Sequence, residues 1–373
     1  MVINSCFWRD KKVLITGHTG FKGSWLSLWL QILGVELLGY SLPVPTQPSL
    51  YDLALVGKGM TSIEGDIRDL EHLSQVIKDF QPEIVFHMAA QPLVRHSYAN
   101  PVETYSVNVM GTVHLLEAVR QVGTVRSLVN ITSDKCYENR EWVWGYREQE
   151  PMGGYDPYSS SKGCAELVTA AYRNSFFPAD SSTAIATARA GNVIGGGDWS
   201  LDRLIPDILR AITNKQTIII RNPQAIRPWQ HVLDPLTGYL LLAEKLYQNS
   251  PQDSDQNLGR HLNQGHQDFR SGWNFGGSDR DTQPVAWIVD KLLELWGDAG
   301  VGWECDQVLQ PHEANYLKLD CSKAKTHLDW EPQLDLTTAL AWVVTWTKAW
   351  DQGADMRDFT KQQILKYVNK LIK

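Results

Sequence analysis

Tyr158 and Lys162 have the spacing of a proton-transfer pair. Because they are four residues apart, their side chains share one face if this segment is helical. A lysine ammonium beside a phenol favours the phenolate and lowers its pKa. A phenolate can take the proton of a sugar hydroxyl while a hydride leaves the same carbon for a nicotinamide ring. The pair therefore indicates oxidation of a hydroxyl, although Tyr-x-x-x-Lys is also common by chance.

A second reactive group, Ser133, Asp134 and Lys135, follows a predicted buried strand. Ser133 is placed to hydrogen-bond the hydroxyl that Tyr158 deprotonates. Asp134 and Lys135 supply an acid and an amine, and their position in the predicted cleft favours a functional role over a solvated turn. Lys135 can act as a base only when neutral. Burial or nearby Lys162 would depress its pKa and Asp134 would raise it, so the sequence leaves its role open between a base and a positioning cation.

A glycine-rich segment, Gly17-His-Thr-Gly20-Phe-Lys-Gly23, comes directly after the first predicted strand and opens a helix. Glycines permit the tight turn and the close approach of the backbone to a pyrophosphate. The N–H groups at a helix N-terminus attract phosphate. Gly17, Gly20, Phe21, Lys22 and Gly23 are therefore predicted cofactor contacts, and the other interpretation is a tight structural turn.

The end of the second predicted strand does not distinguish NAD from NADP. It reads Tyr40-Ser41-Leu42, with neither an acid for the ribose nor an arginine for a 2′-phosphate. Asp66 and Ile67, just before the helix expected over 69–80, are plausible adenine contacts, but a solvated turn explains them equally well.

Short apolar runs alternate with helical patterns in the first half of the chain, which predicts a doubly wound parallel α/β sheet. The expected strands are 12–16, 36–40, 83–87, 127–132 and 183–189, and the expected helices are 21–33, 69–80, 100–122 and 158–176. Further helices are expected at 204–213, 281–296 and 336–350, with loop-rich stretches at 190–202 and 221–235. We predict a Rossmann domain over 1–190, to which parts of 231–260 return, and a smaller, partly interleaved nucleotide-sugar-binding domain over 191–373.

The composition is that of a globular protein, with 43% hydrophobic and 21% charged residues. A net charge of −7 argues against nucleic acid as a partner. The five cysteines form no C-x-x-C pair and the histidines have no metal-ligand spacing, so neither a disulfide scaffold nor a metal is indicated. Neither a signal peptide nor a membrane span is apparent, and a cytoplasmic, soluble protein is expected.

These motifs together resemble the extended short-chain dehydrogenase/reductase family, in its NAD-dependent epimerase/dehydratase branch. The resemblance covers nearly the whole chain and includes His87-Met-Ala-Ala90 and Arg189-Ala-Gly-Asn192, segments that line the cofactor cleft in that family. It implies NAD as cofactor, with Ala89 and Ala90 among its contacts beside Tyr158 and Lys162.

The residues beside Ser133 narrow the resemblance. Epimerases of the family usually carry small residues there, whereas sugar-nucleotide 4,6-dehydratases carry an acid and a base. The dTDP-glucose enzymes have Asp-Glu, but this chain has Asp134-Lys135 and is in this respect similar to the dehydratases that act on CDP-glucose. Three further segments show the same similarity: Gly20-Phe-Lys-Gly-Ser-Trp25, Gly195-Gly-Gly-Asp-Trp199 and Arg227-Pro-Trp-Gln-His-Val232.

The resemblance implies a hydro-lyase that converts CDP-glucose to CDP-4-dehydro-6-deoxyglucose, for the deoxysugars of bacterial surface polysaccharides such as O-antigen. Tyr158 would take the C4 hydroxyl proton, Lys135 the C5 proton, and Asp134 would protonate the departing C6 hydroxyl. A nucleoside diphosphate needs cationic or N–H donors. The predicted substrate contacts are Gln91, Asn192, Arg203, Arg221 and Arg227.

Two other interpretations stay open. A sugar-nucleotide epimerase would need only Ser133, Tyr158 and Lys162, and a dinucleotide-binding regulator would need none of the chemistry. By analogy with the family, a homodimer, or a dimer of dimers, is expected through helices 100–122 and 158–176. His87 is expected to be a hydrogen-bonded core residue, and His231 is more simply a structural loop residue than a catalytic one.

Overall fold

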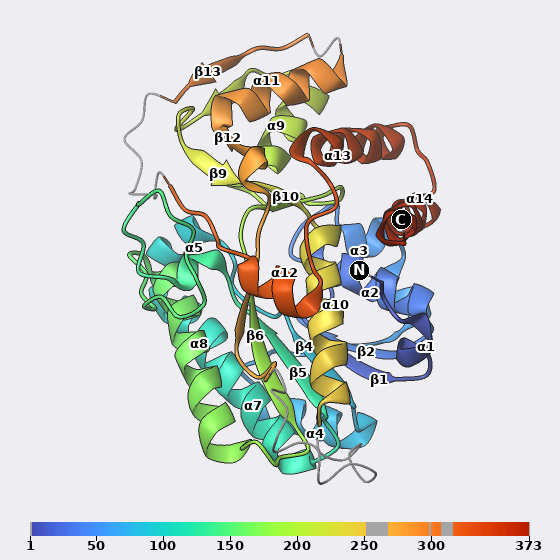
Figure 1. Ribbon diagram of the computed structural model, residues 1–373. Helices are drawn as coiled ribbons and strands as arrows, with labels where there is room; N and C mark the ends of the chain where they lie inside the picture. Colours follow the sequence, from blue (N-terminus) through green and yellow to red (C-terminus); the bar gives the residue numbers. More distant parts are fainter. Residues whose placement is uncertain (1, 251–267, 298–299, 307–315, 373) are drawn as a thin grey trace.

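The computed structural model describes residues 2–250, 268–297, 300–306 and 316–372. Its centre is a parallel seven-stranded sheet with strand order β11-β6-β5-β4-β1-β2-β3 (Figure 1). The strands are β1 (Lys12–Thr16), β2 (Glu36–Ser41), β3 (Thr61–Glu64), β4 (Ile84–His87), β5 (Ser127–Ile131), β6 (Ala184–Ala190) and β11 (Gly272–Phe275). The doubly wound parallel sheet predicted from the sequence is confirmed.

Successive side chains of a strand point to opposite faces, so each strand contributes to two cores. Leu14 of β1 packs with α4 (Leu70–Phe80), α7 (Gly111–Val122) and α8 (Pro157–Phe176). Val13 and Ile15 pack on the other face, with α2 (Phe21–Leu33) and α10 (Leu233–Gln248). Trp25 and Trp29 of α2 are fully buried in this second core, so they serve packing.

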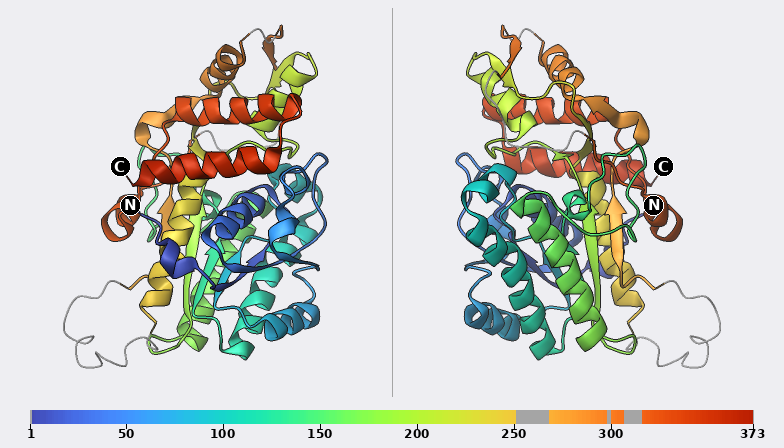
Figure 2. Two further views of the ribbon diagram at one scale, coloured as in Figure 1. Left: turned by 90° about the vertical axis from the view of Figure 1, so that its right-hand side faces the viewer. Right: turned by 90° about the vertical axis from the view of Figure 1, so that its left-hand side faces the viewer.

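The remaining elements form a smaller part at the carboxyl ends of the sheet strands (Figure 1). It contains α9 (Leu204–Thr213), α11 (Val285–Trp296), α13 (Leu336–Asp351) and three two-stranded sheets. Those sheets pair β7 (Val193–Ile194) with β10 (Gln230–His231), β8 (Ile218–Ile220) with β13 (Trp303–Cys305), and β9 (Ile226–Pro228) with β12 (Thr282–Pro284). Helix α14 (Met356–Leu371) lies beside α13 and packs on α2 (Figure 2).

Short helices complete the described chain: α1 (Ser5–Trp8), α3 (Leu50–Leu53), η1 (Val56–Gly59), α5 (Val94–Ala99), η3 (Asp134–Cys136), η5 (Asp279–Asp281) and α12 (Ser322–Leu328). In the described ranges, no helix combines the length and apolar character needed to cross a membrane.

The long helix predicted over 100–122 is present from Pro101 to Val122, but it contains a π-helical turn. The segment is α6 (Pro101–Tyr105), a π-helical turn at Ser106–Met110, and α7. The wide turn contains Asn108, whose amide accepts from the Gln91 N–H at 2.8 Å and donates to the Ser161 hydroxyl at 2.9 Å. π-turns within helices are frequent near functional sites, and this one fixes the segment after β4 against α8.

Candidate active site

The predicted site residues come together along one edge of the sheet, because parallel strands end at the same side. Gly17 follows β1, Asp66 follows β3, Ala89 follows β4, Asp134 follows β5, and Asn192 follows β6. The sequence-distant motifs are therefore neighbours in space at the carboxyl edge, below the smaller part of the chain (Figure 1).

The glycine-rich loop has the shape that a dinucleotide needs. Gly17 has φ +78°, and a Cβ there would lie 2.7 Å from the Ala89 nitrogen. A Cβ at Gly23 would lie 2.1 Å from the Gly17 carbonyl oxygen, so the loop can close only with glycine. Gly20 differs, because its Cβ would meet only the Gly17 oxygen at 3.4 Å. Gly20 is the N-cap of α2 and no side chain caps the helix, which leaves its first N–H groups for phosphate.

The predicted adenine end is a polar turn. Arg68 binds the Asp66 carboxylate with its backbone N–H at 2.8 Å and with its guanidinium, and these contacts lower the Asp66 pKa. Ile67 is buried against Gly111 of α7. At the end of β2, the hydroxyls of Ser41 and Thr19 lie 2.8 Å apart. The loop and these polar groups fit the phosphates and the ribose of a dinucleotide.

Tyr158 and Lys162 lie in the first turns of α8, which begins after the N-cap Asp156 with Pro157 at its first position. Both side chains are buried. Burial raises the pKa of Tyr158 to about 12, a hydrogen bond with Ser133 and the charge of Arg203 lower it, and Asp134 raises it. The main cation acting on Tyr158 is thus Arg203, from outside the motif. Burial lowers the pKa of Lys162 to about 8, opposed by Glu166.

Asp134 lies inside this centre, with only 4% of its surface exposed. Its carboxylate accepts a hydrogen bond from the Ser133 hydroxyl at 3.0 Å. Its other side rests on Gly191, where a Cβ would overlap the Asp134 carboxylate. Lys135 is less buried, and its backbone N–H donates to the Ser133 hydroxyl at 3.2 Å. Ser133 therefore joins Tyr158 to Asp134, a link that the neighbouring positions in the sequence only suggested.

The predicted substrate residues separate into two groups. Arg203 donates to Asp198 at 2.9 Å, and its charge acts on Tyr158. Arg221 lies farther out and pairs with Asp202 at 3.1 Å.

The other three predicted substrate residues, Arg227, Asn192 and Gln91, make hydrogen bonds to nearby groups of the chain. Arg227 donates to the Ile226 carbonyl at 2.9 Å in β9, and Asn192, at φ 46°, accepts from the Gln230 N–H through its own carbonyl at 3.2 Å. The Gln91 side-chain amide donates to Thr104 at 2.9 Å and to the Leu93 carbonyl.

A buried ion pair that the sequence analysis missed supports the centre. Arg189 of β6 binds Glu166 of α8 at 2.8 Å, with both side chains 5% exposed. Thr187 donates to the same carboxylate, and Arg189 also donates to the Tyr137 hydroxyl. Glu166 is four residues after Lys162, so the helical spacing could have placed it on the same face. The side chain of Arg189 is thus committed to this network beneath the cleft.

Both singled-out histidines are structural. His87 is bonded to Thr16 at 2.7 Å and lies 3.3 Å from the Thr112 hydroxyl, and burial lowers its pKa to about 3. His231 is fully buried between the rings of Trp25 and Trp342 and accepts from the Leu233 N–H at 3.3 Å. Across the described ranges, no three His, Cys, Asp or Glu side chains gather in a way that could hold a metal ion.

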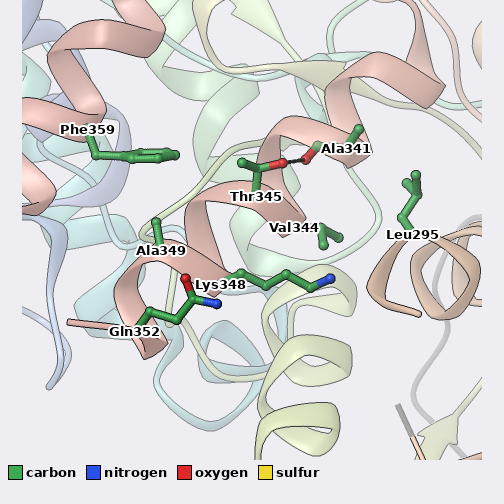
Figure 3. Close-up of a pocket in the computed structure, with 8 residues that line it drawn as sticks. All are labelled: Leu295, Ala341, Val344, Thr345, Lys348, Ala349, Gln352 and Phe359. Atoms are coloured by element: carbon green, nitrogen blue, oxygen red, sulfur yellow. Dashed lines mark hydrogen bonds between the residues drawn. The ribbon is translucent and has the colours of Figure 1, made fainter. Parts of the chain in front are cut away.

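A surface hollow lies away from this centre, between α11, α13 and α14 (Figure 3). Its lining is largely apolar, and Lys348 in its wall donates to the Trp296 carbonyl at 2.7 Å. None of the predicted site residues lines it.

A Rossmann sheet with a Ser-Tyr-Lys centre and an adjoining buried acid defines a dinucleotide-dependent enzyme of the short-chain dehydrogenase/reductase type. The family model of GDP-mannose 4,6-dehydratase matches residues 14–342. The chain therefore belongs to this family of nucleotide-sugar dehydratases, which are hydro-lyases.

Individual relatives that match nearly the whole chain are also nucleotide-sugar 4,6-dehydratases. The chain is 57% identical to CDP-glucose 4,6-dehydratase of Salmonella typhimurium over 99% of both chains. It is 23% identical to a dTDP-glucose 4,6-dehydratase of Xanthomonas campestris, covering 91% of this chain and 95% of that one. Among solved structures, dTDP-glucose 4,6-dehydratase DesIV of Streptomyces venezuelae, with NAD and TYD bound, has the same fold. Its TM-score is 0.74 at 21% identity, over 92% of this chain and 99% of that one.

Proposed function

We propose that this chain dehydrates CDP-glucose to CDP-4-dehydro-6-deoxyglucose with NAD as a cofactor that is regenerated in each turnover. The observation that carries the proposal is the buried Asp134 beside Ser133 and Tyr158, because an epimerase would need no acid there. The 57% identity to the Salmonella CDP-glucose enzyme supports the choice of substrate. NAD fits the loop, whose glycines leave the N-terminus of α2 open to phosphate. When bound, NAD would supply the acceptor for the C4 hydride and the donor of that hydride to C6.

Oxidation at C4 depends on Tyr158, which must accept the hydroxyl proton. Its phenolate is opposed by burial and by Asp134, so it needs the stabilisation that Ser133 and Arg203 provide. The Lys162 ammonium is held below the end of β5, where it donates to the Ile131 carbonyl at 3.5 Å.

The dehydration step needs a proton donor for the C6 hydroxyl and a base for C5. We assign the donor to Asp134, with Lys135 as the base predicted from the sequence. Tyr158 gains one proton from the C4 hydroxyl, and Asp134 loses one proton to the departing water. Ser133 bonds Asp134 and lies within hydrogen-bonding reach of Tyr158, so it can pass this proton on and restore both groups.

The substrate nucleotide would lie in the smaller part of the chain, which supplies Arg203, Arg221 and Arg227. We assign residues 1–190 to cofactor binding and most of 191–373 to the nucleotide sugar. Arg203 reaches the reaction centre and suits the phosphate nearest the sugar, while Arg221 suits a more distant charge.

A second copy of the chain is the proposed partner. Val102, Tyr105, Met110, Leu167 and Phe176 expose 37–81% of their surfaces on α6, the π-turn and α8. Such side chains on adjacent helices suit a four-helix contact between two copies. Light scattering of the purified protein tests this, and a monomer at micromolar concentration would contradict it. The five free cysteines suit a reducing cytoplasm.

The substrate assignment is tested by incubating the protein and NAD with CDP-glucose and, in parallel, with dTDP-, UDP- and GDP-linked sugars. A 4-keto sugar from CDP-glucose, with no net reduced nicotinamide, is the expected result. A keto sugar formed from the dTDP-, UDP- or GDP-linked sugar instead would show that the enzyme prefers a different nucleotide base. Interconversion of the C4 epimers without loss of water would instead establish an epimerase.

A further inference from the structure

Arg95 and Arg221 come from different parts of the chain, yet both bind the same carboxylate. Arg95 lies in α5, which follows β4 of the central sheet, and Arg221 follows β8 of the smaller part. Each guanidinium donates a hydrogen bond of 3.1 Å to Oδ1 of Asp202. One carboxylate oxygen therefore lies between two cations that no sequence motif connects.

The three side chains are accessible to a ligand. Arg95, Asp202 and Arg221 keep 37%, 38% and 29% of their side-chain surfaces exposed. Ion pairs with this exposure contribute little to stability, so the arginines can exchange Asp202 for another anion without a large loss. A diphosphate carries more charge and more acceptor oxygens than a carboxylate, and arginine binds such groups with paired hydrogen bonds. This position therefore suits a diphosphate.

Both sides of the position are anchored next to Tyr158. The Ser97 hydroxyl, two residues after Arg95, accepts from the Tyr158 backbone N–H at 3.1 Å. Asp202 directly precedes Arg203, whose charge acts on Tyr158. Tyr158 is the proposed base at C4, and the diphosphate of a nucleotide sugar is joined to C1, on the other side of the same ring. Two arginines that meet near Tyr158 are thus where the diphosphate is expected.

We propose that Arg95 is a substrate-binding residue and that Asp202 holds the place of the substrate diphosphate in the free enzyme. The inference rests on the proposed function and adds a residue of the sheet part to its cationic ligands, because Arg203, Arg221 and Arg227 all come from the smaller part. When a nucleotide sugar binds, its diphosphate displaces the Asp202 carboxylate and accepts the hydrogen bonds of Arg95 and Arg221. The bound diphosphate then connects the two parts of the chain.

The experiment measures the dissociation constants of CDP, cytidine and NAD by isothermal titration calorimetry for wild type, Arg95→Met and Asp202→Asn. Arg95→Met should weaken CDP binding by about 10-fold or more, because hydrogen bonds to a charged phosphate are lost. Asp202→Asn should tighten CDP binding by about 3- to 10-fold, because no carboxylate then competes for the arginines. Asparagine also suits the left-handed backbone of this position, where φ is 60°. Cytidine and NAD should bind all three proteins equally.

The ion pair of Arg270 and Asp268 provides matched controls. The two side chains are 2.9 Å apart, and they precede β11 at the amino ends of the sheet strands, away from the proposed site. Arg270→Met and Asp268→Asn change the net charge by the same amounts as the test variants and should leave CDP binding unchanged. Equal effects in the controls would show that net charge, and not contact with the diphosphate, sets the affinity.

Other results would overturn the proposal. Unchanged CDP binding in Arg95→Met would exclude a contact with the diphosphate, and an equal weakening of cytidine would show general disruption of the site. Weaker or unchanged CDP binding in Asp202→Asn would show that Asp202 orients the arginines and is not displaced. A loss confined to NAD would make Arg95 a cofactor ligand.

Turnover separates this proposal from the function on which it rests. With CDP-glucose, Arg95→Met should raise KM and leave kcat nearly unchanged, because a diphosphate contact is made in the ground state and the transition state alike. A lower kcat at unchanged KM would contradict the proposal. If wild type binds UDP, dTDP or GDP but not CDP, the base preference of the proposed function fails, and the same variants test Arg95 with the nucleotide that binds. If wild type binds none of the four, both proposals fail.

Discussion

Two groups of buried polar side chains lie close together around the end of β5, and they differ in how completely they are bonded. Beneath the cleft, Arg189 is held by Glu166 and Tyr137, and Tyr137 in turn donates to Asn274 at 2.7 Å. In the cleft, the buried Tyr239 hydroxyl has no hydrogen-bond partner among the described residues. Buried polar groups without partners cost free energy, whereas fully bonded ones stabilise the fold. The first group supports the fold, and the second lies where the proposed substrate would bind.

The largest effect is expected from Tyr158→Phe, which removes the group that accepts the C4 proton. Turnover should fall by about 10²- to 10⁴-fold, and no reduced nicotinamide should form on mixing with substrate. Stopped-flow absorbance with CDP-glucose measures this. Rapid formation of reduced nicotinamide in the variant would show that another group starts the reaction.

Arg189→Met tests the completely bonded group. Removing one partner of a buried ion pair leaves Glu166 uncompensated, so the free energy of unfolding should fall by about 3–5 kcal/mol. Urea denaturation followed by tryptophan fluorescence measures the change. The control is Arg95→Met, because the side chains of Arg95 and its partner Asp202 are 37% and 38% exposed. The free energy of unfolding of this variant should fall by at most about 1 kcal/mol. Equal losses would remove the distinction between the two environments.

Gly191→Ala tests how the open group is positioned. The added Cβ would overlap the Asp134 carboxylate and displace it. A shift of this kind should reduce dehydration by about 10²-fold while bound nicotinamide is still reduced. Rates of keto-sugar formation and of nicotinamide reduction, measured side by side, separate the two steps. Gly123→Ala is the control for inserting a methyl group, since its Cβ would meet no neighbouring atom, although its positive φ adds strain of its own. A proportional loss of both steps in Gly191→Ala would mean general disruption.

The smallest effect is expected on the free energy of unfolding when the buried tyrosines Tyr137 and Tyr239 are each replaced by phenylalanine. Tyr137→Phe loses hydrogen bonds to Asn274 and Arg189 and should destabilise the protein by about 1–3 kcal/mol. Tyr239→Phe loses no bond and should leave the free energy of unfolding unchanged or slightly higher. Denaturant midpoints of the two variants give the comparison. A larger loss for Tyr239→Phe would show that its hydroxyl is engaged in the free enzyme.

Local sequence patterns predicted many of the strands, helices and site residues of this chain. The strand Lys12–Thr16 and the helix Phe21–Leu33 were predicted to the residue, because apolar periodicity and the glycine loop define both ends. Tyr158 and Ser133 were expected in the centre because each directly adjoins a predicted element.

Long-range contacts were not predictable in the same way. The strand Gly272–Phe275 completes the sheet but is short and far along the chain, so nothing local marks it as a partner of β6. Helix Met356–Leu371 was not foreseen, because its apolar positions are diluted by charged ones. The contact of Asp134 with Gly191 depends on tertiary packing, which residue spacing does not report.

The most direct measurement of the central claim is the fate of a label. CDP-glucose carrying deuterium at C4 is converted by the protein and NAD, and the product is examined by NMR. An intramolecular dehydration centred on Tyr158 and Asp134 predicts deuterium at C6 of a 4-keto-6-deoxy sugar. Deuterium retained at C4 of a hexose that has lost no water would contradict the account.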